Sequence, residues 1–165
     1  MSILHSFWTW LTATYAGKLA ASSFVSMLPI IELRGGVPLA VGMGLPPKVA
    51  IPLCVVSNFV PIIPAILFIE QLLRWMRQRG KLLRSIALWL EQRVMKHQDV
   101  LDKYAWLGLM ILTAIPLPGT GAWTASMLAG LANVPIRKAF PAIALGVVIA
   151  AVIMSVLSYG VAAVV

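Results

Sequence analysis

The stretch LPIIELRGGVPLAVGMG, residues 28–44, places a carboxylate and a guanidinium two residues apart in a segment that is otherwise uncharged. Glu32 and Arg34 are the only charged residues between Leu19 and Pro47. An ionisable group at the centre of a bilayer costs roughly 2.5 to 3.5 kcal/mol on insertion scales. Two charges in so apolar a segment therefore need a structural or a functional reason.

The composition is that of a membrane protein. Of the 165 residues, 61% are hydrophobic and only 11% are charged, whereas about a quarter of the residues in an ordinary soluble domain are charged. The apolar material suffices for two to four membrane spans at roughly 20 residues each. We therefore expect a single multi-pass membrane domain over 1–165, located in the cell (inner) membrane.

The positive charge is concentrated in one place. The net charge is +8, and eight of the thirteen Lys and Arg residues lie between Arg74 and Lys103, with long apolar segments on either side. This placement follows the positive-inside rule and predicts that the basic linker 74–103 is cytoplasmic. Basic residues beside a membrane gain about 1 kcal/mol each from anionic lipids, so we expect membrane lipids, and no nucleic acid, as its partner.

The residues that catalytic sites need are scarce. Cys54 is the only cysteine, and the two histidines, His5 and His97, lie in segments that we expect at the membrane surface. No His, Cys and carboxylate cluster can be assembled for a catalytic metal, nor a Ser-His-acid set inside the membrane. The sequence therefore predicts a protein that is not an enzyme, with no catalytic residue, cofactor or metal.

The chain matches itself at an offset of 89 residues without a gap, which pairs residues 1–76 with 90–165. The identical pairs are Tyr15/Tyr104, Ala16/Ala105, Leu28/Leu117, Pro29/Pro118, Leu39/Leu128, Ala40/Ala129, Pro46/Pro135, Ala50/Ala139 and Pro52/Pro141. Proline marks where helices start, bend or stop, so three coincident prolines weigh more than the other identities. We predict repeat one at 1–76, a basic linker at 77–89 and repeat two at 90–165; the alternative is chance agreement.

Each repeat holds a broken apolar stretch, 19–45 or 105–134, and then a long apolar helix, about 47–73 or about 136–163. Irregular backbone at membrane depth persists only where it is buried in protein or lines a wet cavity. We therefore predict re-entrant hairpins, each followed by one crossing, so that consecutive repeats are inverted. Such inverted repeats are common in transporters. The alternative is four conventional spans with kinks at the prolines and both termini inside.

The fold predicted is thus an all-α integral membrane protein, an inverted repeat of re-entrant hairpin plus transmembrane helix joined by a basic amphipathic helix. The linker has apolar residues at helical spacing and basic residues for a polar face, so it should lie on the membrane surface. In the last long helix Gly146 and Ala150 form a small-xxx-small pair, which predicts close helix packing within or between subunits.

The first hairpin carries the candidate chemistry. A guanidinium offers a planar fork of donors suited to phosphate or carboxylate, and burial of a carboxyl favours its protonated form, so such a group can exchange protons. We predict that Arg34, with Gly35 and Gly36, binds substrate and that Glu32 couples protons. The alternative is a buried ion pair that only fixes the hairpin.

The second hairpin tip, PLPGTGAW at residues 116–123, is uncharged, as is the whole segment between Lys103 and Arg137. Unwound backbone at such tips can hold ions and substrates in transporters, which predicts an opposing wall of the substrate site. Its residues would be Gly119, Thr120, Gly121 and Trp123, which falls opposite Arg34 at the repeat offset. Secondary polar positions are Thr124, Ser126 and, in the first span, Asn58, for which an interhelical hydrogen bond is the default role.

ELRGGVP and PLPGTGAW together resemble the small multidrug export protein family, a distant branch of the DedA/VTT superfamily. The resemblance extends over most of the chain. It implies an integral membrane protein with two facing re-entrant hairpins, and an association with proton-linked transport and with flipping of lipid phosphates. DedA-type proteins usually carry an arginine in the second hairpin too, and here Trp123 and its neighbours supply none.

The sequence therefore predicts a proton-coupled membrane transporter that moves an anionic lipid or lipid-phosphate head group. One alternative is a small-molecule or multidrug exporter, although Arg34 argues against a cationic drug. The other is a non-transporting membrane scaffold or assembly subunit. One chain has little material to enclose a pathway, so a homodimer is a reasonable expectation.

Overall fold

The computed structural model describes residues 9–95, 98–117 and 120–162. Within these ranges every regular element is a helix, which confirms the all-α prediction. The helices are α2 (Tyr15–Met27), α3 (Glu32–Gly42), α4 (Pro47–Phe59), α5 (Ile62–Gln78), α6 (Lys81–Met95), α7 (Gln98–Ala114), α8 (Ala122–Leu131) and α9 (Ile136–Ala162).

The chain forms two compact units. Unit 1 comprises Met1–Val60 and Val148–Val165, and unit 2 comprises Pro61–Val147. Unit 1 therefore contains α2, α3, α4 and the later part of α9, whereas unit 2 contains α5 to α8 and the earlier part of α9. Each unit is described by itself.

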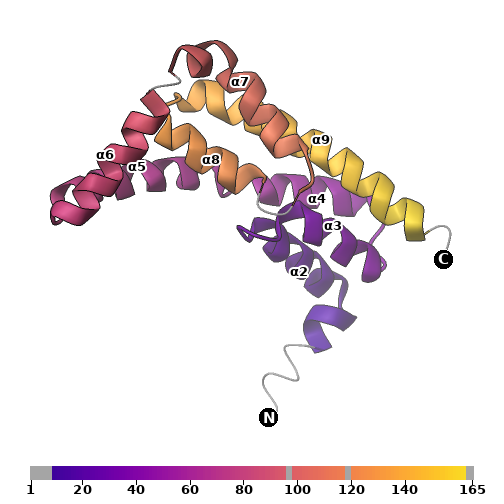
Figure 1. Cartoon of the computed structure of the whole chain (residues 1–165). Coiled ribbons are helices and arrows are strands. Elements are labelled where there is room, and N and C mark those ends of the chain that lie inside the picture. Colours follow the sequence, from indigo (N-terminus) through magenta and orange to yellow (C-terminus); the bar gives the residue numbers. More distant parts are fainter. Residues whose placement is uncertain (1–8, 96–97, 118–119, 163–165) are drawn as a thin grey trace. The chain divides into compact units, whose positions relative to one another are not determined.

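In unit 1 the helices α2, α3 and α4 pack against one another in pairs (Figure 1). Gly36 lets α3 approach α2 closely, because a Cβ there would lie 3.1 Å from the carbonyl oxygen of Ser22. The turn between α3 and α4 is covered by Tyr159 of α9, whose hydroxyl donates to the carbonyl of Leu45 at 2.9 Å. An apolar cluster under this turn joins Ala40, Leu45 and Ala50, with Leu19 and Tyr159 packed against it.

In unit 2 the helix α8 packs against α5 and α7. At Gly130 a Cβ would lie 2.7 Å from the backbone oxygen of Ile66, so α8 and α5 meet without a side chain between them. At Gly146 a Cβ would lie 2.6 Å from the oxygen of Met110, so α9 approaches α7 in the same way. The close packing predicted at Gly146 is confirmed, and it occurs within the chain.

Both broken stretches end one helix and start another. α2 and α3 are separated by a turn over residues 28–31, and the IPLPGTGAW segment separates α7 from α8. Pro118 and Gly119 lie outside the described residues. The long apolar helix predicted over about 47–73 lies within the apolar helical stretch Pro47–Gln78, which is divided where α4 ends at Phe59 and α5 begins at Ile62. Pro61 lies at this break, and proline cannot donate the backbone hydrogen bond of a helix interior.

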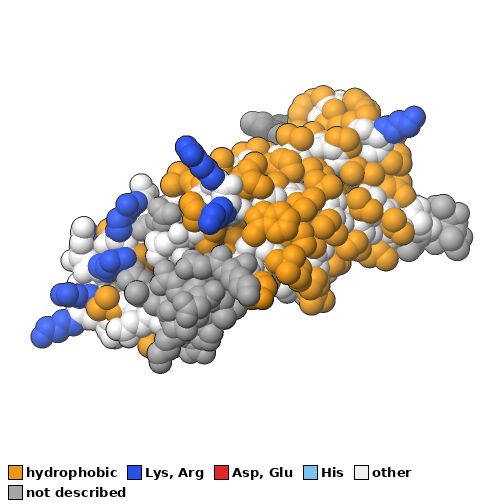
Figure 2. Space-filling model, turned by 90° about the horizontal axis from the view of Figure 1, so that it is seen from above, with side chains coloured by type: hydrophobic (Ala, Val, Ile, Leu, Met, Phe, Trp, Pro, Cys, Tyr) orange, Lys and Arg blue, Asp and Glu red, His pale blue; other side chains and the backbone are white. Residues whose placement is uncertain are grey.

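Two stretches of the described chain are long and apolar enough to cross a membrane, Pro47–Gln78 and Ile136–Gly160. Many large hydrophobic side chains remain exposed on the helices, and Figure 2 shows how much of the visible surface they form. These features are those of an integral membrane protein.

The same local backbone occurs twice at the offset of 89 residues. α4 begins at Pro47 and α9 at Ile136, 89 residues later. The amide of Leu45 donates to Ala40 at 2.9 Å, and the amide of Val134 donates to Ala129 at 2.9 Å, which is the same pairing moved by 89. A left-handed residue recurs as well, as Gly44 (φ 73°) and Asn133 (φ 53°), whereas the pair Glu32 (φ 52°) and Gly121 (φ 140°) shares only the positive sign of φ.

Candidate functional site

Glu32 is a buried carboxylate at an unusual backbone position. It is the first residue of α3, has a φ of 52° and is only 4% exposed. A left-handed conformation costs a non-glycine residue roughly 1 to 2 kcal/mol, and the equivalent residue at the repeat offset is a glycine, Gly121. Such an outlier is a reason to look for function. The competing explanation is a negative charge placed at a helix N-terminus, which is favourable by itself.

Arg34 lies in the first turn of the same helix and is half-buried. It interacts electrostatically with Glu32. The sequence left open whether RGGVP would be helical or extended, and the structure has it helical within α3, including Pro38. Residues two apart on a regular helix do not face each other, but Glu32 departs from regular helical backbone with its φ of 52°.

Gly35 and Gly36 serve the packing of α3. Gly36 is buried at the contact with α2, where a Cβ would come close to Ser22 and Ser26. At Gly35 a Cβ would meet the side chain of Ile31. Both glycines therefore allow the short helix to lie close to its neighbours, whether or not they also contact a substrate.

A group of buried and partly buried polar residues lies where α2, α3 and α4 meet. We name it the polar cluster, and it comprises Ser22, Ser23, Ser26, Ser57 and Asn58. Asn58 is fully buried and its amide donates to the carbonyl of Ser26 at 3.2 Å, which confirms the interhelical hydrogen bond predicted for it. Further hydrogen bonds connect the hydroxyl of Ser26 with the carbonyl of Ser22 (2.8 Å) and the hydroxyls of Ser23 and Ser57 (2.6 Å).

Two atoms of the polar cluster have no hydrogen-bond partner in the described structure, Asn58 Oδ1 and Ser22 Oγ. An unsatisfied buried polar group costs about 1 to 3 kcal/mol, so these atoms favour a water molecule or a polar ligand group beside them. Gly36, which contacts the cluster, follows Glu32 by one turn of α3.

In the second hairpin tip, the polar groups of Thr120 and Gly121 form hydrogen bonds within the loop and with the first turn of α8. The amide of Thr120 donates to Leu117 at 3.2 Å, and its hydroxyl donates to the carbonyls of Ile115 (3.0 Å) and Leu117 (2.9 Å). Gly121 is buried, and its carbonyl accepts the amide of Ala125. Gly119 lies outside the described residues. The Thr120 groups predicted for the opposing wall thus stabilise the loop itself.

The other candidates of the second hairpin lie on α8. Ser126 is buried and its hydroxyl donates to Ala122 one turn earlier at 2.5 Å. Thr124 is exposed and Trp123 is half-buried in the first turn of α8. Glu32, Arg34 and Asn58 thus all lie in unit 1, whereas the described candidates of the second hairpin lie in unit 2.

Sequence reasoning missed the serines of the polar cluster. Ser22 and Ser26 lie one turn apart in the mostly apolar second half of α2, and this spacing was a usable signal. Among the described residues, no group of three or more His, Cys, Asp or Glu side chains could hold a metal ion.

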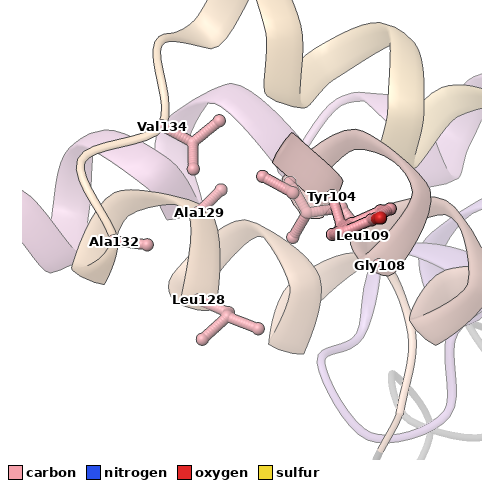
Figure 3. Close-up of a pocket in the computed structure, with 8 residues that line it drawn as sticks. Tyr104, Gly108, Leu109, Leu128, Ala129, Ala132 and Val134 are labelled. Atoms are coloured by element: carbon pink, nitrogen blue, oxygen red, sulfur yellow. The ribbon is translucent and has the colours of Figure 1, made fainter. Parts of the chain in front are cut away.

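Two of the cavities among the described residues lie in unit 2. The first, of about 170 Å³, lies between α7 and α8 and is lined by apolar side chains and by Tyr104 (Figure 3). Gly108 contributes to it, since a Cβ there would meet nothing within 4 Å; the equivalent residue in unit 1 is Leu19, which packs into the apolar cluster. The second cavity, of about 220 Å³, lies where the end of α5 meets the turn between α8 and α9.

A family model described as "Putative small multi-drug export protein" matches residues 32–153. The chain belongs to this family. The match begins at Glu32, covers α3, the basic segment and the second hairpin, and confirms the resemblance predicted from the sequence motifs. The family is one of exporters and not of enzymes. Comparisons with curated proteins and with solved structures gave no match.

Proposed function

We propose that the protein exports small molecules across the membrane, with Glu32, Arg34 and the polar cluster forming its substrate and proton site. The family supports a small molecule over the anionic lipid head group that the sequence alone predicted first. The observation that carries the site is the buried carboxylate of Glu32, held at a left-handed backbone position at the start of the helix that packs against the polar cluster through Gly36.

The chemistry follows from this arrangement. When the carboxyl is ionised, it binds a donor group of the substrate together with the open acceptor of Asn58; when it takes up a proton, that interaction weakens and the substrate leaves. Because proton and substrate compete for one group, a proton gradient drives export. Arg34 adds a planar fork of donors, which selects substrates that carry an anionic or acceptor group.

A second candidate substrate is the phosphate head group of a lipid. Arg34 is the observation that favours it, because guanidinium groups bind phosphate through two parallel hydrogen bonds. The charge of Arg34 counts against a purely cationic drug in either case.

The inverted repeat and the re-entrant hairpins belong to this proposal. The recurrence of the same turns at an offset of 89 residues supports a duplication. The content of the units supports a duplication as well. Unit 1 contains the first hairpin, α4 and the later part of α9, and unit 2 contains α5, the second hairpin and the earlier part of α9. Two inverted repeats would place a site near the midplane of the bilayer, with the basic segment on the cytoplasmic side and a homodimer as the assembly.

The test uses the full-length protein in proteoliposomes with an imposed pH gradient. The probes are ethidium as a cation, carboxyfluorescein as an anion and a fluorescent phosphatidic acid as a lipid phosphate. Glu32→Gln should abolish the dependence of flux on the pH gradient, and Arg34→Gln should reduce anion flux by about tenfold, as expected for one charged hydrogen bond, with partial rescue in Arg34→Lys. Glu91→Gln on α6 is the matched carboxylate control and should transport normally.

Glu32→Gly separates function from stability. Glycine relieves the left-handed backbone at φ 52°, so this variant should be as stable as the wild type or more stable by up to about 1 kcal/mol, yet inactive. Normal, gradient-dependent transport by either Glu32 variant would refute the proton-coupling role. Flux of the lipid phosphate alone would move the assignment to the second candidate, and no flux of any probe, with normal assembly, would favour a scaffold.

A further inference from the structure

The second cavity of unit 2 is polar and positively charged. Arg74 and Arg77 line it from the last turns of α5, and Asn133 and Val134 line it from the turn between α8 and α9. Its volume of about 220 Å³ exceeds that of the roughly 150 Å³ engineered cavities that bind benzene, so a phosphate group fits inside. None of these residues belongs to the site around Glu32 and Arg34.

The equivalent turn in unit 1 shows that this fold does not require the arginines. There Leu45 takes the place of Val134 at the repeat offset, and the turn is covered by Tyr159, whose hydroxyl donates to the carbonyl of Leu45. The same backbone is therefore closed by an aromatic residue in unit 1 and surrounded by two arginines in unit 2. The turn itself can therefore form without a pair of arginines beside it.

The sequence around the cavity places it at the depth of lipid head groups. Trp75, adjacent to Arg74, is 48% exposed, and the guanidinium of Arg79 lies 5.4 Å from the centre of its ring. Exposed tryptophans in membrane proteins gather at the membrane–water interface, and the apolar stretch that contains α5 ends at Gln78. The phosphates of the bilayer lie at this level.

We propose that this cavity binds the phosphate group of an anionic lipid, with Arg74 and Arg77 supplying the complementary charge. Arginine forms bidentate, charge-assisted hydrogen bonds with phosphate oxygens, and basic residues on the cytoplasmic side of membrane helices attract anionic lipids. The lipid is a bound partner of unit 2 and not the transported substrate. This inference stands whether or not Glu32 and Arg34 carry out transport.

The experiment is native mass spectrometry of the full-length protein, titrated with phosphatidylglycerol, phosphatidylcholine or inorganic phosphate. The wild type should retain phosphatidylglycerol in preference to phosphatidylcholine. The Arg74→Gln/Arg77→Gln double variant should bind phosphatidylglycerol at least about tenfold more weakly, because each charged hydrogen bond contributes about 1.5 to 3 kcal/mol. Arg84→Gln removes an exposed arginine of α6 that does not line the cavity and should bind normally.

A second variant keeps both arginines and the fold. Asn133→Asp adds a negative charge to the cavity at a residue with φ 53°, a conformation that Asp tolerates, and should weaken phosphatidylglycerol binding. Gly44→Asp introduces the same charge at the equivalent turn of unit 1, where space is open, and should leave binding unchanged.

Three results would overturn the proposal. Arg84→Gln could weaken binding as much as the double variant, which would mean that only the overall charge matters. The double variant and Asn133→Asp could both bind normally, which would show that the cavity does not hold the lipid phosphate. Inorganic phosphate could bind with at least the affinity of the lipid, which would assign the cavity to a soluble anion.

Discussion

The two hairpins share the geometry of the turn that follows them but differ in the charge and polarity of their side chains. α3 and α8 are followed by the same turn, with the same amide-to-carbonyl pairs and a left-handed residue at the same place. The hairpin with α3 carries Glu32 and Arg34 and rests on the polar cluster, whereas the described residues of the hairpin with α8 carry no charge. The backbone geometry of the two turns therefore coincides, whereas the charged residues lie in one hairpin.

The positions that differ between the copies show how this division is made. Glu32 corresponds to Gly121, Asn58 corresponds to Val147, and Gly130 corresponds to Val41. The first two exchanges place polar groups in unit 1, and the third lets α8 lie against α5 in unit 2. Substitutions that swap these residues test the comparison directly.

Gly130→Val should have the largest effect. A Cβ at Gly130 would lie 2.7 Å from the backbone oxygen of Ile66, and backbone cannot move aside cheaply. Overpacking typically costs about 1 to 3 kcal/mol and occasionally more, so we expect loss of most folded protein. Size-exclusion profiles and melting temperatures of the detergent-solubilised variant measure this effect.

The controls for Gly130→Val use the same substitution where space is free. At Gly108 an added Cβ meets nothing within 4 Å, so Gly108→Val should fold normally. The reverse exchange, Val41→Gly in α3, should cost about 1 kcal/mol, the usual penalty for glycine within a helix. Equal folding of Gly130→Val and Gly108→Val would contradict the close contact between α5 and α8.

Asn58→Val should act on transport more than on stability. The variant loses the hydrogen bond to Ser26 but also removes the unpartnered Oδ1 atom, so the two effects on the free energy of unfolding largely cancel. We expect a melting temperature within about 4 °C of the wild type, which corresponds to about 1 kcal/mol at this chain length. Transport in proteoliposomes should fall about tenfold, because the polar cluster loses a group that binds substrate.

Thr113→Val is the matched control for Asn58→Val. Thr113 is also buried, but its hydroxyl donates to Leu109 within its own helix at 2.7 Å, so its loss should leave transport intact. A large fall in the melting temperature of Asn58→Val, with full transport by the remaining folded protein, would show that the polar cluster is only structural.

The sequence predicted the framework well because proline and glycine define it. The breaks within both hairpins, the start of α9 and the two long apolar stretches all follow from Pro, Gly and hydrophobic length. The break at Pro61 was missed, since an apolar run of sufficient length favours a single helix. RGGVP was difficult to assign because its glycines also fit a turn, and only the close contact with α2 explains a helix there.

The site could be predicted only in part. Glu32 and Arg34 stand out because charges are rare in apolar segments, and the structure finds Glu32 buried. The serines of the polar cluster did not stand out, because serine in an apolar helix often bonds to its own backbone. Only the packing of α2 against α4 joins them to Asn58. The internal hydrogen bonds of Thr120 depend on loop geometry in the same way.

The smallest effects should come from the left-handed residues of the two turns. Gly44 has a φ of 73°, so Gly44→Ala should cost about 1 kcal/mol, since alanine disfavours this conformation. Asn133→Ala should cost a similar amount, whereas Asn133→Gly should change the free energy of unfolding by only a few tenths of a kcal/mol, because asparagine already tolerates it. The melting temperatures of these three variants, measured side by side with that of the wild type, test these expectations. If Gly44→Ala is neutral while Asn133→Ala is costly, the two turns do not share one backbone, and the duplication loses its main structural support.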